Sequence, residues 1–228
     1  MHSTKDTLEI LFEDNHLLIV NKKSGDIVQA DKTGDKPLSE VVKEYIKEKY
    51  NKPGDVFLGV IHRLDRPTSG IIIFARTSKA LERLNKMLRE RNVSKTYWAV
   101  IKNNPKNTKD TLIHFLKKNP KNNKSTVFKK EAEGSKKAIL HYTIIKNLKN
   151  YSLLEIDLET GRHNQIRAQL SFIGSPIKGD LKYGASRSNK DGSIHLHARK
   201  INFTHPVSKK IITIIAPVPN EVIWNACM

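Results

Sequence analysis

Residues 62–75 read His-Arg-Leu-Asp-Arg-Pro-Thr-Ser-Gly-Ile-Ile-Ile-Phe-Ala, a polar turn that runs directly into an apolar strand. A single carboxylate, Asp65, lies between Arg63 and Arg66. Neighbouring cations hold a carboxylate ionised, and an ionised carboxylate can act as a nucleophile or stabilise developing positive charge. A turn that enters a buried strand is also a rigid support for such a group. A charge cluster at a surface turn explains these residues equally well, because such clusters are common and stabilise little.

The charge of the whole chain indicates the kind of partner. The 228 residues carry a formal net charge of +18. An excess of this size is typical of a protein that binds a polyanion, because neutralised phosphates release their condensed counterions. The sequence therefore predicts a nucleic acid as partner. A membrane surface is disfavoured, because no basic amphipathic helix with a broad apolar face stands out.

The apolar and cysteine content indicates the compartment. No apolar run approaches the roughly 18–20 residues that cross a bilayer, and residues 1–7 lack the apolar stretch of a signal peptide. Cys227, the only cysteine, lies one residue from the end, so neither a disulfide framework nor a thiolate metal site is predicted. We therefore expect a cytoplasmic protein.

Apolar periodicity predicts one domain of the α+β class, with a mixed, mainly antiparallel sheet and flanking helices. Short apolar runs on either side of Glu13-Asp14-Asn15 predict a β-hairpin. The second helix is expected to begin after Ser78, which is a good N-cap residue. The predicted strands of the first hundred residues cover 8–12, 17–20, 56–61, 71–75 and 96–101, and the predicted helices cover 38–50 and 79–91.

Residues 102–149 form a basic region. It contains thirteen lysines and only three acids, and strand-like runs recur at 111–115, 125–128 and 138–145. This pattern predicts a basic antiparallel meander that contacts the polyanion, because so high a density of like charge is otherwise costly. A merely solvated lysine-rich face is the alternative.

Two residues beyond the Asp65 segment are candidates for chemistry or binding. Arg167 ends the stretch Gly161–Arg167, which follows a predicted half-buried strand at 154–158, and its guanidinium could orient and ionise a carboxylate. Binding of a phosphate or pairing with Glu159 is about as probable. Tyr97 could stack on a base, although an aromatic side chain in a strand is more often part of the core.

Other functional classes fit the residues poorly. His195 and His197 share one face of a predicted strand and could meet one metal ion, but no further ligand completes the set, so no metal is predicted. The loop 174–184 lacks the Gly-Lys-Ser/Thr of a nucleotide-binding P-loop. No second acid accompanies Asp65 in a tight motif, which disfavours a two-carboxylate glycosidase.

The segments just described resemble, in order, the pseudouridine synthases of the RluA-like family. The resemblance covers nearly the whole chain, and the string His62–Gly70 is its most specific part. The matching segments are 8–22, 62–70, 95–100, 161–167, 176–184, 196–198 and 205–206. The resemblance implies a catalytic domain over residues 8–217, with terminal extensions at 1–7 and 218–228 and without an S4-like RNA-binding domain.

The resemblance also implies a reaction and a partner. The resemblance implies isomerisation of uridine to pseudouridine in ribosomal or transfer RNA by a monomer, without a metal or organic cofactor. Two alternatives stay open: a non-catalytic RNA-binding relative, and a nucleoside or glycoside hydrolase. The chain departs from the family pattern in Lys23-Ser24-Gly25, where Pro-Ala-Gly is usual, and in His163-Asn164, where Thr-His is usual.

The same resemblance implies a role for each site residue. Asp65 matches the catalytic aspartate, Tyr97 the tyrosine that stacks on the base, and Arg167 the arginine that pairs with the aspartate. The remaining matches imply contacts with the substrate. Arg63 is expected to help displace the target nucleotide, Ile166 to pack near the uracil, and His62, Arg66, Arg162 and Gln165 to bind the RNA substrate.

Overall fold

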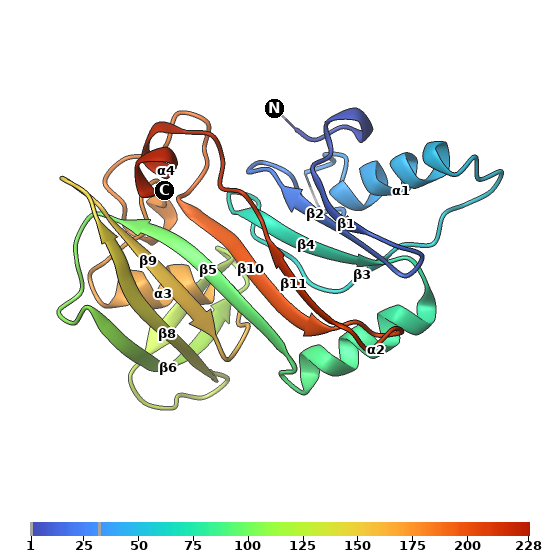
Figure 1. The fold of residues 1–228 in the computed structure, drawn as a ribbon. Helices are drawn as coiled ribbons and strands as arrows, with labels where there is room; N and C mark the ends of the chain where they lie inside the picture. Colours follow the sequence, from blue (N-terminus) through green and yellow to red (C-terminus); the bar gives the residue numbers. More distant parts are fainter. Residues whose placement is uncertain (1, 32) are drawn as a thin grey trace. The chain divides into compact units, whose positions relative to one another are not determined.

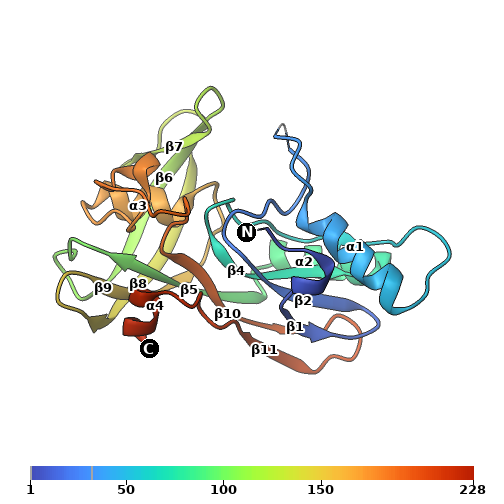
Figure 2. The ribbon, with the colours of Figure 1, turned by 90° about the horizontal axis from the view of Figure 1, so that it is seen from above.

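The computed structural model describes residues 2–31 and 33–228. Its chain divides into two compact units, which Figures 1 and 2 show as a ribbon. Unit 1 comprises the chain up to Val93 together with Ala198–Pro219, and unit 2 comprises Ser94–His197 with Asn220–Met228. The described strand pairs are antiparallel and helices flank the strands, so the predicted α+β class is confirmed. No helix of the described residues is long and apolar enough to cross a membrane.

Unit 1 is a helix-covered antiparallel sheet. Strand β2 lies between β1 and β4, β3 pairs with β4, and β11 pairs with β10. The predicted hairpin and the first helix are confirmed. The strands are β1 (Ile10–Glu13), β2 (Leu17–Lys22), β3 (Gly59–Val60), β4 (Ser69–Ala75), most of β10 (Leu196–Thr204) and β11 (Ile211–Ile215), and the helices are η1 (Lys5–Thr7), α1 (Leu38–Lys49) and α2 (Ser78–Arg89).

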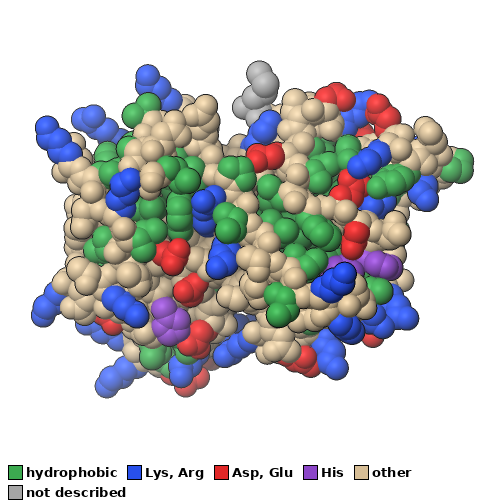
Figure 3. Space-filling model, viewed as in Figure 1, with side chains coloured by type: hydrophobic (Ala, Val, Ile, Leu, Met, Phe, Trp, Pro, Cys, Tyr) green, Lys and Arg blue, Asp and Glu red, His purple; other side chains and the backbone are tan. Residues whose placement is uncertain are grey.

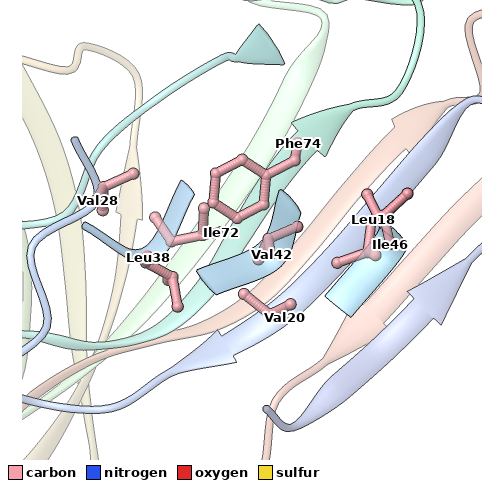
Figure 4. Packing of buried hydrophobic residues seen from close by; sticks show 8 residues of the cluster. All are labelled: Leu18, Val20, Val28, Leu38, Val42, Ile46, Ile72 and Phe74. Atoms are coloured by element: carbon pink, nitrogen blue, oxygen red, sulfur yellow. The ribbon is translucent and has the colours of Figure 1, made fainter. Parts of the chain in front are cut away.

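The core of unit 1 forms because strand and helix periodicities meet on one face. Alternate residues of β4, Ile72 and Phe74, point toward α1, which presents side chains at helical spacing. Figure 4 shows this cluster, in which the side chains of β2, β4 and α1 face one another. Its buried members are Leu18, Val20, Val28, Leu38, Val42, Ile46, Ile72 and Phe74.

Two local predictions for unit 1 are wrong. The run 56–61 is not a buried strand, because only Gly59 and Val60 reach the edge of β4 and the side chain of Phe57 is 49% exposed. Apolar composition alone could not reveal that the run lacks a pairing partner over most of its length. The N-cap of α2 is Thr77, whose hydroxyl accepts a hydrogen bond from Ala80 N at 3.2 Å, and Ser78 is the first helical residue.

Gly70, which follows the Asp65 turn, lies where strand β10 passes too closely for a side chain. Its φ is +114°, and a Cβ here would lie 2.5 Å from the backbone N and O of Ala198. We expect Gly70→Ala to destabilise unit 1 by about 3 kcal/mol, through backbone strain and overpacking. Urea unfolding followed by circular dichroism measures the effect. Gly54→Ala is the control, because a Cβ there meets nothing within 4 Å; equal unfolding midpoints for the two variants would contradict the close approach.

Unit 2 is an antiparallel sheet in the order β5-β9-β8-β6-β7. Helix α3 lies over one face of this sheet (Figure 2), where Gln169 Nε2 donates to the carbonyl oxygens of Leu112 at 3.2 Å and Ala138 at 3.4 Å. The strands of unit 2 are β5 (Val93–Ile101, shared with unit 1), β6 (Lys109–Asn119), β7 (Lys124–Phe128), β8 (Lys136–Asn147) and β9 (Ser152–Leu158), and its helices are α3 (Gln165–Phe172), η2 (Leu181–Tyr183) and α4 (Val222–Cys227). The three strands predicted for the basic region are confirmed, but the predicted meander is wrong, because β8 pairs with β6 and not with β7. Apolar periodicity predicts the strands but not the order in which they pair.

The two faces of this sheet differ in charge. On the face away from α3, Thr96 Oγ1 donates to Asp157 at 2.7 Å and Trp98 Nε1 to Glu155 at 3.1 Å. Figure 3 views this face, where acidic side chains lie among the lysines. Tyr97, which alternates with these residues along β5, is buried on the other face. The acids of β9 therefore point away from the face that carries α3.

Candidate functional site

Asp65 lies at the start of a tight turn in unit 1. The Asp65 carbonyl oxygen accepts a hydrogen bond from Thr68 N at 3.0 Å, which closes the turn immediately before β4. The preceding residue, Leu64, packs against the hydrophobic core of unit 1. The backbone bond and the packing of Leu64 hold the backbone at Asp65, whose side chain is half-buried.

The end of β2 and the loop that follows it hold the backbone of this turn through hydrogen bonds. The Lys22 ammonium, 1% exposed, donates to the carbonyl oxygens of Lys23 at 2.9 Å, Asp26 at 2.7 Å and Arg66 at 3.1 Å. Gly25 N also donates to Arg66 O at 2.9 Å. A buried ammonium with three carbonyl acceptors thus ties the two loops together.

The departure from the family pattern at residues 23–25 leaves this support intact. Ser24 Oγ donates to the carbonyl oxygen of Pro67 at 3.0 Å, so the serine adds a bond to the Asp65 turn. Gly25 has φ +96°, a conformation that glycine adopts without strain. The altered residues therefore still hold the Asp65 turn.

Burial lowers the pKa of Lys22 to about 8, although Asp26 and Asp65 favour its charged form. The unfolded chain keeps this proton up to about pH 10.5, so stability contributed by Lys22 rises with pH above about 8 and is absent below it. We expect wild type to gain about 2 kcal/mol more than Lys22→Met between about pH 7.5 and about pH 9.5. Urea unfolding at both pH values tests this. The exposed Lys47→Met should follow wild type, and a parallel response of Lys22→Met would contradict the prediction.

The other polar residues of the turn lie around Asp65 in unit 1. Arg63 is exposed, and within the described residues no hydrogen bond or ion pair engages it. Arg66 Nη2 pairs with Asp35 Oδ2 at 2.7 Å in an exposed ion pair. His62 Nε2 accepts a hydrogen bond from Ile73 N at 3.2 Å, so this histidine is fixed against β4.

Arg167 is held in unit 2 by a buried ion pair. Its Nε donates to Asp180 Oδ2 at 2.7 Å and its Nη2 to Asp180 Oδ1 at 2.8 Å. The two side chains are 6% and 1% exposed, and the guanidinium carbon lies 5.0 Å from the centre of the Tyr183 ring. The fork and the ring together fix the plane of the guanidinium. The predicted alternative partner, Glu159, instead binds His141 Nε2 at 2.7 Å.

Hydrogen bonds among residues 160–165 fix the loop that leads into α3. Gln165 Oε1 accepts from Thr160 Oγ1 at 2.8 Å and from Arg162 N at 3.0 Å, while Arg162 Nε donates to Lys137 O at 2.9 Å. These bonds assign a folding role to both predicted substrate-binding residues, and their contact with substrate stays a prediction.

The unusual pair His163-Asn164 is accommodated by its neighbours. Asn164 has φ +51°, which asparagine tolerates better than most residues, and its Nδ2 donates to the Tyr183 hydroxyl at 3.1 Å. Ser125 Oγ donates to His163 O at 2.6 Å. Both residues therefore take part in the contacts of this loop with β7 and η2.

The sequence-predicted residues fall into two sets. Asp65, His62, Arg63 and Arg66 belong to unit 1. The structure places the others in unit 2, where Tyr97 is 9% exposed on β5 and Ile166 is 4% exposed on α3. The unit 2 residues are Tyr97, Arg162, Gln165, Ile166 and Arg167.

Sequence reasoning gave no role to Lys22, Asp180 or Tyr183. These residues lie in the stretches Val-Asn-Lys and Gly-Asp-Leu-Lys-Tyr-Gly, which carry part of the resemblance. Because they bind the backbone and side chains of distant segments, only the fold reveals their partners.

The two histidines weighed as metal ligands have other contacts. His195 Nε2 lies 2.9 Å from Glu221 Oε2, and its Nδ1 lies 3.0 Å from Asn189 Nδ2. The rings of His195 and His197 lie 5.3 Å and 5.9 Å from that of Trp224 on α4. Both histidines therefore serve to dock the C-terminal helix.

Comparison with known proteins points to one family. A family model described as RNA pseudouridylate synthase matches residues 16–172. The chain is 32% identical over 225 residues to ribosomal large subunit pseudouridine synthase D of Zymomonas mobilis, covering 94% of this chain and 70% of that protein. It is 37% identical over 216 residues to ribosomal large subunit pseudouridine synthase C of Buchnera aphidicola, covering 92% of this chain and 66% of that protein.

The fold is also similar to a solved structure. Human RNA pseudouridylate synthase domain containing 4 superposes with a TM-score of 0.79 at 22% identity, covering 96% of this chain and 92% of that one. This likeness concerns the fold. The chain spans about two thirds of the length of the curated relatives it matches.

Proposed function

Because the chain belongs to the RNA pseudouridylate synthase family, we propose that it isomerises specific uridines of structured RNA to pseudouridine with Asp65 as the catalytic carboxylate. The observation that carries this proposal is the way in which the backbone around Asp65 is held. Its turn is closed by Thr68 N, and the buried Lys22 binds the carbonyl oxygen of the next residue. A charged residue whose backbone is held this firmly suits catalysis better than surface solvation does.

The chemistry requires few groups. The enzyme breaks the C–N glycosidic bond, turns the uracil and forms a C–C bond to the same ribose, with no net transfer of electrons or phosphate. An ionised Asp65 can attack the anomeric carbon, attack the uracil ring, or stabilise a cationic sugar while a glycal forms. The reaction therefore needs a carboxylate, a way to hold the turned base, and a site from which water is excluded.

We assign the supporting roles on the resemblance and the chemistry of each side chain. Tyr97 stacks on the extruded base, Ile166 packs near the uracil, and Arg167 pairs with the catalytic aspartate. Arg63 helps displace the target nucleotide, which its exposure allows. Extrusion costs a few kcal/mol, and base stacking contributes about 1–3 kcal/mol toward it.

The names of the relatives and the basic region 102–149 support RNA as partner. Both named bacterial relatives are described as ribosomal large subunit pseudouridine synthases, so ribosomal RNA is the favoured substrate and transfer RNA the second candidate. The lysines of residues 102–149 supply counter-charge for phosphates. The predicted monomeric state and cytoplasmic location stay predictions.

Tritium release tests the activity. RNA labelled with 5-[³H]uridine, prepared from a strain that lacks this gene, is incubated with the purified protein. We expect tritium release in step with pseudouridine formation, and mapping of the modified positions identifies the RNA. Free uracil as product would indicate a hydrolase, and bound RNA without release from any fraction would indicate a non-catalytic RNA-binding protein.

A further inference from the structure

The ammonium of Lys95 is desolvated, and no described residue provides a counter-ion for it. It lies on β5, half-buried, and burial alone lowers its pKa. In the described part of the chain no hydrogen bond or ion pair to Nζ offsets that burial. Lys22, by contrast, has three carbonyl acceptors for its ammonium. Desolvation of a charge is costly unless an opposite charge or a hydrogen bond offsets it. Binding of an anion beside Lys95 would therefore be favourable.

The face of β5 on which Lys95 lies separates it from the acids of β9. Side chains two residues apart on a strand share a face, so Lys95 lies beside Tyr97 on the face that α3 covers. Asp157 and Glu155 bind Thr96 and Trp98 on the opposite face.

The Lys95 side chain reaches the start of the loop that carries Arg162 and leads into α3, the helix of Arg167. Its Nζ lies 3.7 Å from the position that a Cβ on Gly161 would occupy. Gly161 is exposed, so an incoming anion has access from that side.

We propose that Lys95 binds a backbone phosphate of the RNA strand next to the nucleotide that stacks on Tyr97. The inference rests on the proposed function, because it places the target base on Tyr97. An ammonium is a compact charge with three donors and no acceptor, which suits a phosphate oxygen. Phosphodiesters are the anions that every RNA strand offers at each step, so a site for one fits any sequence around the target uridine.

The salt dependence of RNA binding tests the contact. Dissociation constants are measured at several salt concentrations for a transcript that wild type modifies, with Asp65→Asn present in every protein so that no turnover occurs. We expect Lys95→Gln to bind more weakly and to reduce the slope of log K against log salt by about 0.7, the value of one phosphate on a single strand. Lys95→Arg should retain the slope.

Two controls keep the result specific. Lys47→Gln, which removes an exposed charge from α1, should leave the slope unchanged. Lys95→Gln should melt no lower than the parent, because the charge it removes is unpaired in the free protein. An unchanged slope for Lys95→Gln would overturn the proposal. Lost turnover with normal RNA binding, when Lys95→Gln is made in the protein that retains Asp65, would also overturn it.

A failure of the phosphate contact can be distinguished from a failure of the proposed activity. If wild type binds RNA but releases no tritium from any fraction, the proposed activity fails, and binding of total RNA then replaces the modified transcript as probe. A slope reduced by Lys95→Gln in that case would support the phosphate contact by itself.

Discussion

Asp65→Asn is expected to abolish tritium release from labelled RNA, with a loss of about 10⁴-fold or more in the single-turnover rate. The amide has the size of the carboxylate but carries no negative charge, so it can neither attack a carbon nor stabilise a cationic sugar. The turn should survive, because it uses the Asp65 backbone oxygen and the packing of Leu64. Turnover is therefore lost while fold and RNA binding remain.

Two variants sharpen this result. Asp55→Asn removes an exposed acid from the loop that precedes β3 and should keep full activity. Asp65→Glu keeps the charge but moves it by about 1 Å, and on a rigid mount such a shift costs about 10²-fold. Activity of Asp65→Asn near that of Asp55→Asn would refute the assignment of Asp65. Equal activity of Asp65→Glu and wild type would argue against a rigid mount.

Local patterns predicted most of the strands and helices. The alternation Leu154-Glu155-Ile156-Asp157-Leu158 fixes which face of β9 is buried, because side chains on a strand alternate. The same rule fails for residues 56–61, where burial depends on whether a partner strand is present. Periodicity shows which side chains of a segment can be buried. Whether they are buried depends on the strands and helices that pack against the segment in the fold.

The polar supports of the site were beyond prediction for a related reason. Lysine is almost never fully buried unless it has partners, so the burial of Lys22 could be predicted only by first knowing its partners. Its acceptors are backbone carbonyls, which every residue possesses and no sequence pattern marks. Asp180 likewise binds an arginine thirteen residues earlier across a turn, and a carboxylate in a loop carries no sign of its partner.

Asp180→Ala is expected to lower the stability of unit 2 by about 3–5 kcal/mol, because it removes the carboxylate that binds the buried Arg167 guanidinium through two hydrogen bonds. Both tryptophans, Trp98 and Trp224, belong to unit 2, so urea unfolding followed by tryptophan fluorescence reports on the affected unit. Without these two bonds the guanidinium should also lose its fixed plane. Under the proposed role of Arg167, we expect turnover of the folded variant to fall about 100-fold.

A double-mutant cycle separates the ion pair from other effects of the substitution. Arg167→Met alone should also destabilise, since it leaves the Asp180 carboxylate buried and unpaired. Arg167→Met combined with Asp180→Ala should be more stable than the sum of the two losses predicts, because no buried charge remains. Strict additivity would mean that the two side chains do not stabilise one another, and the buried fork could then not be what orients Arg167.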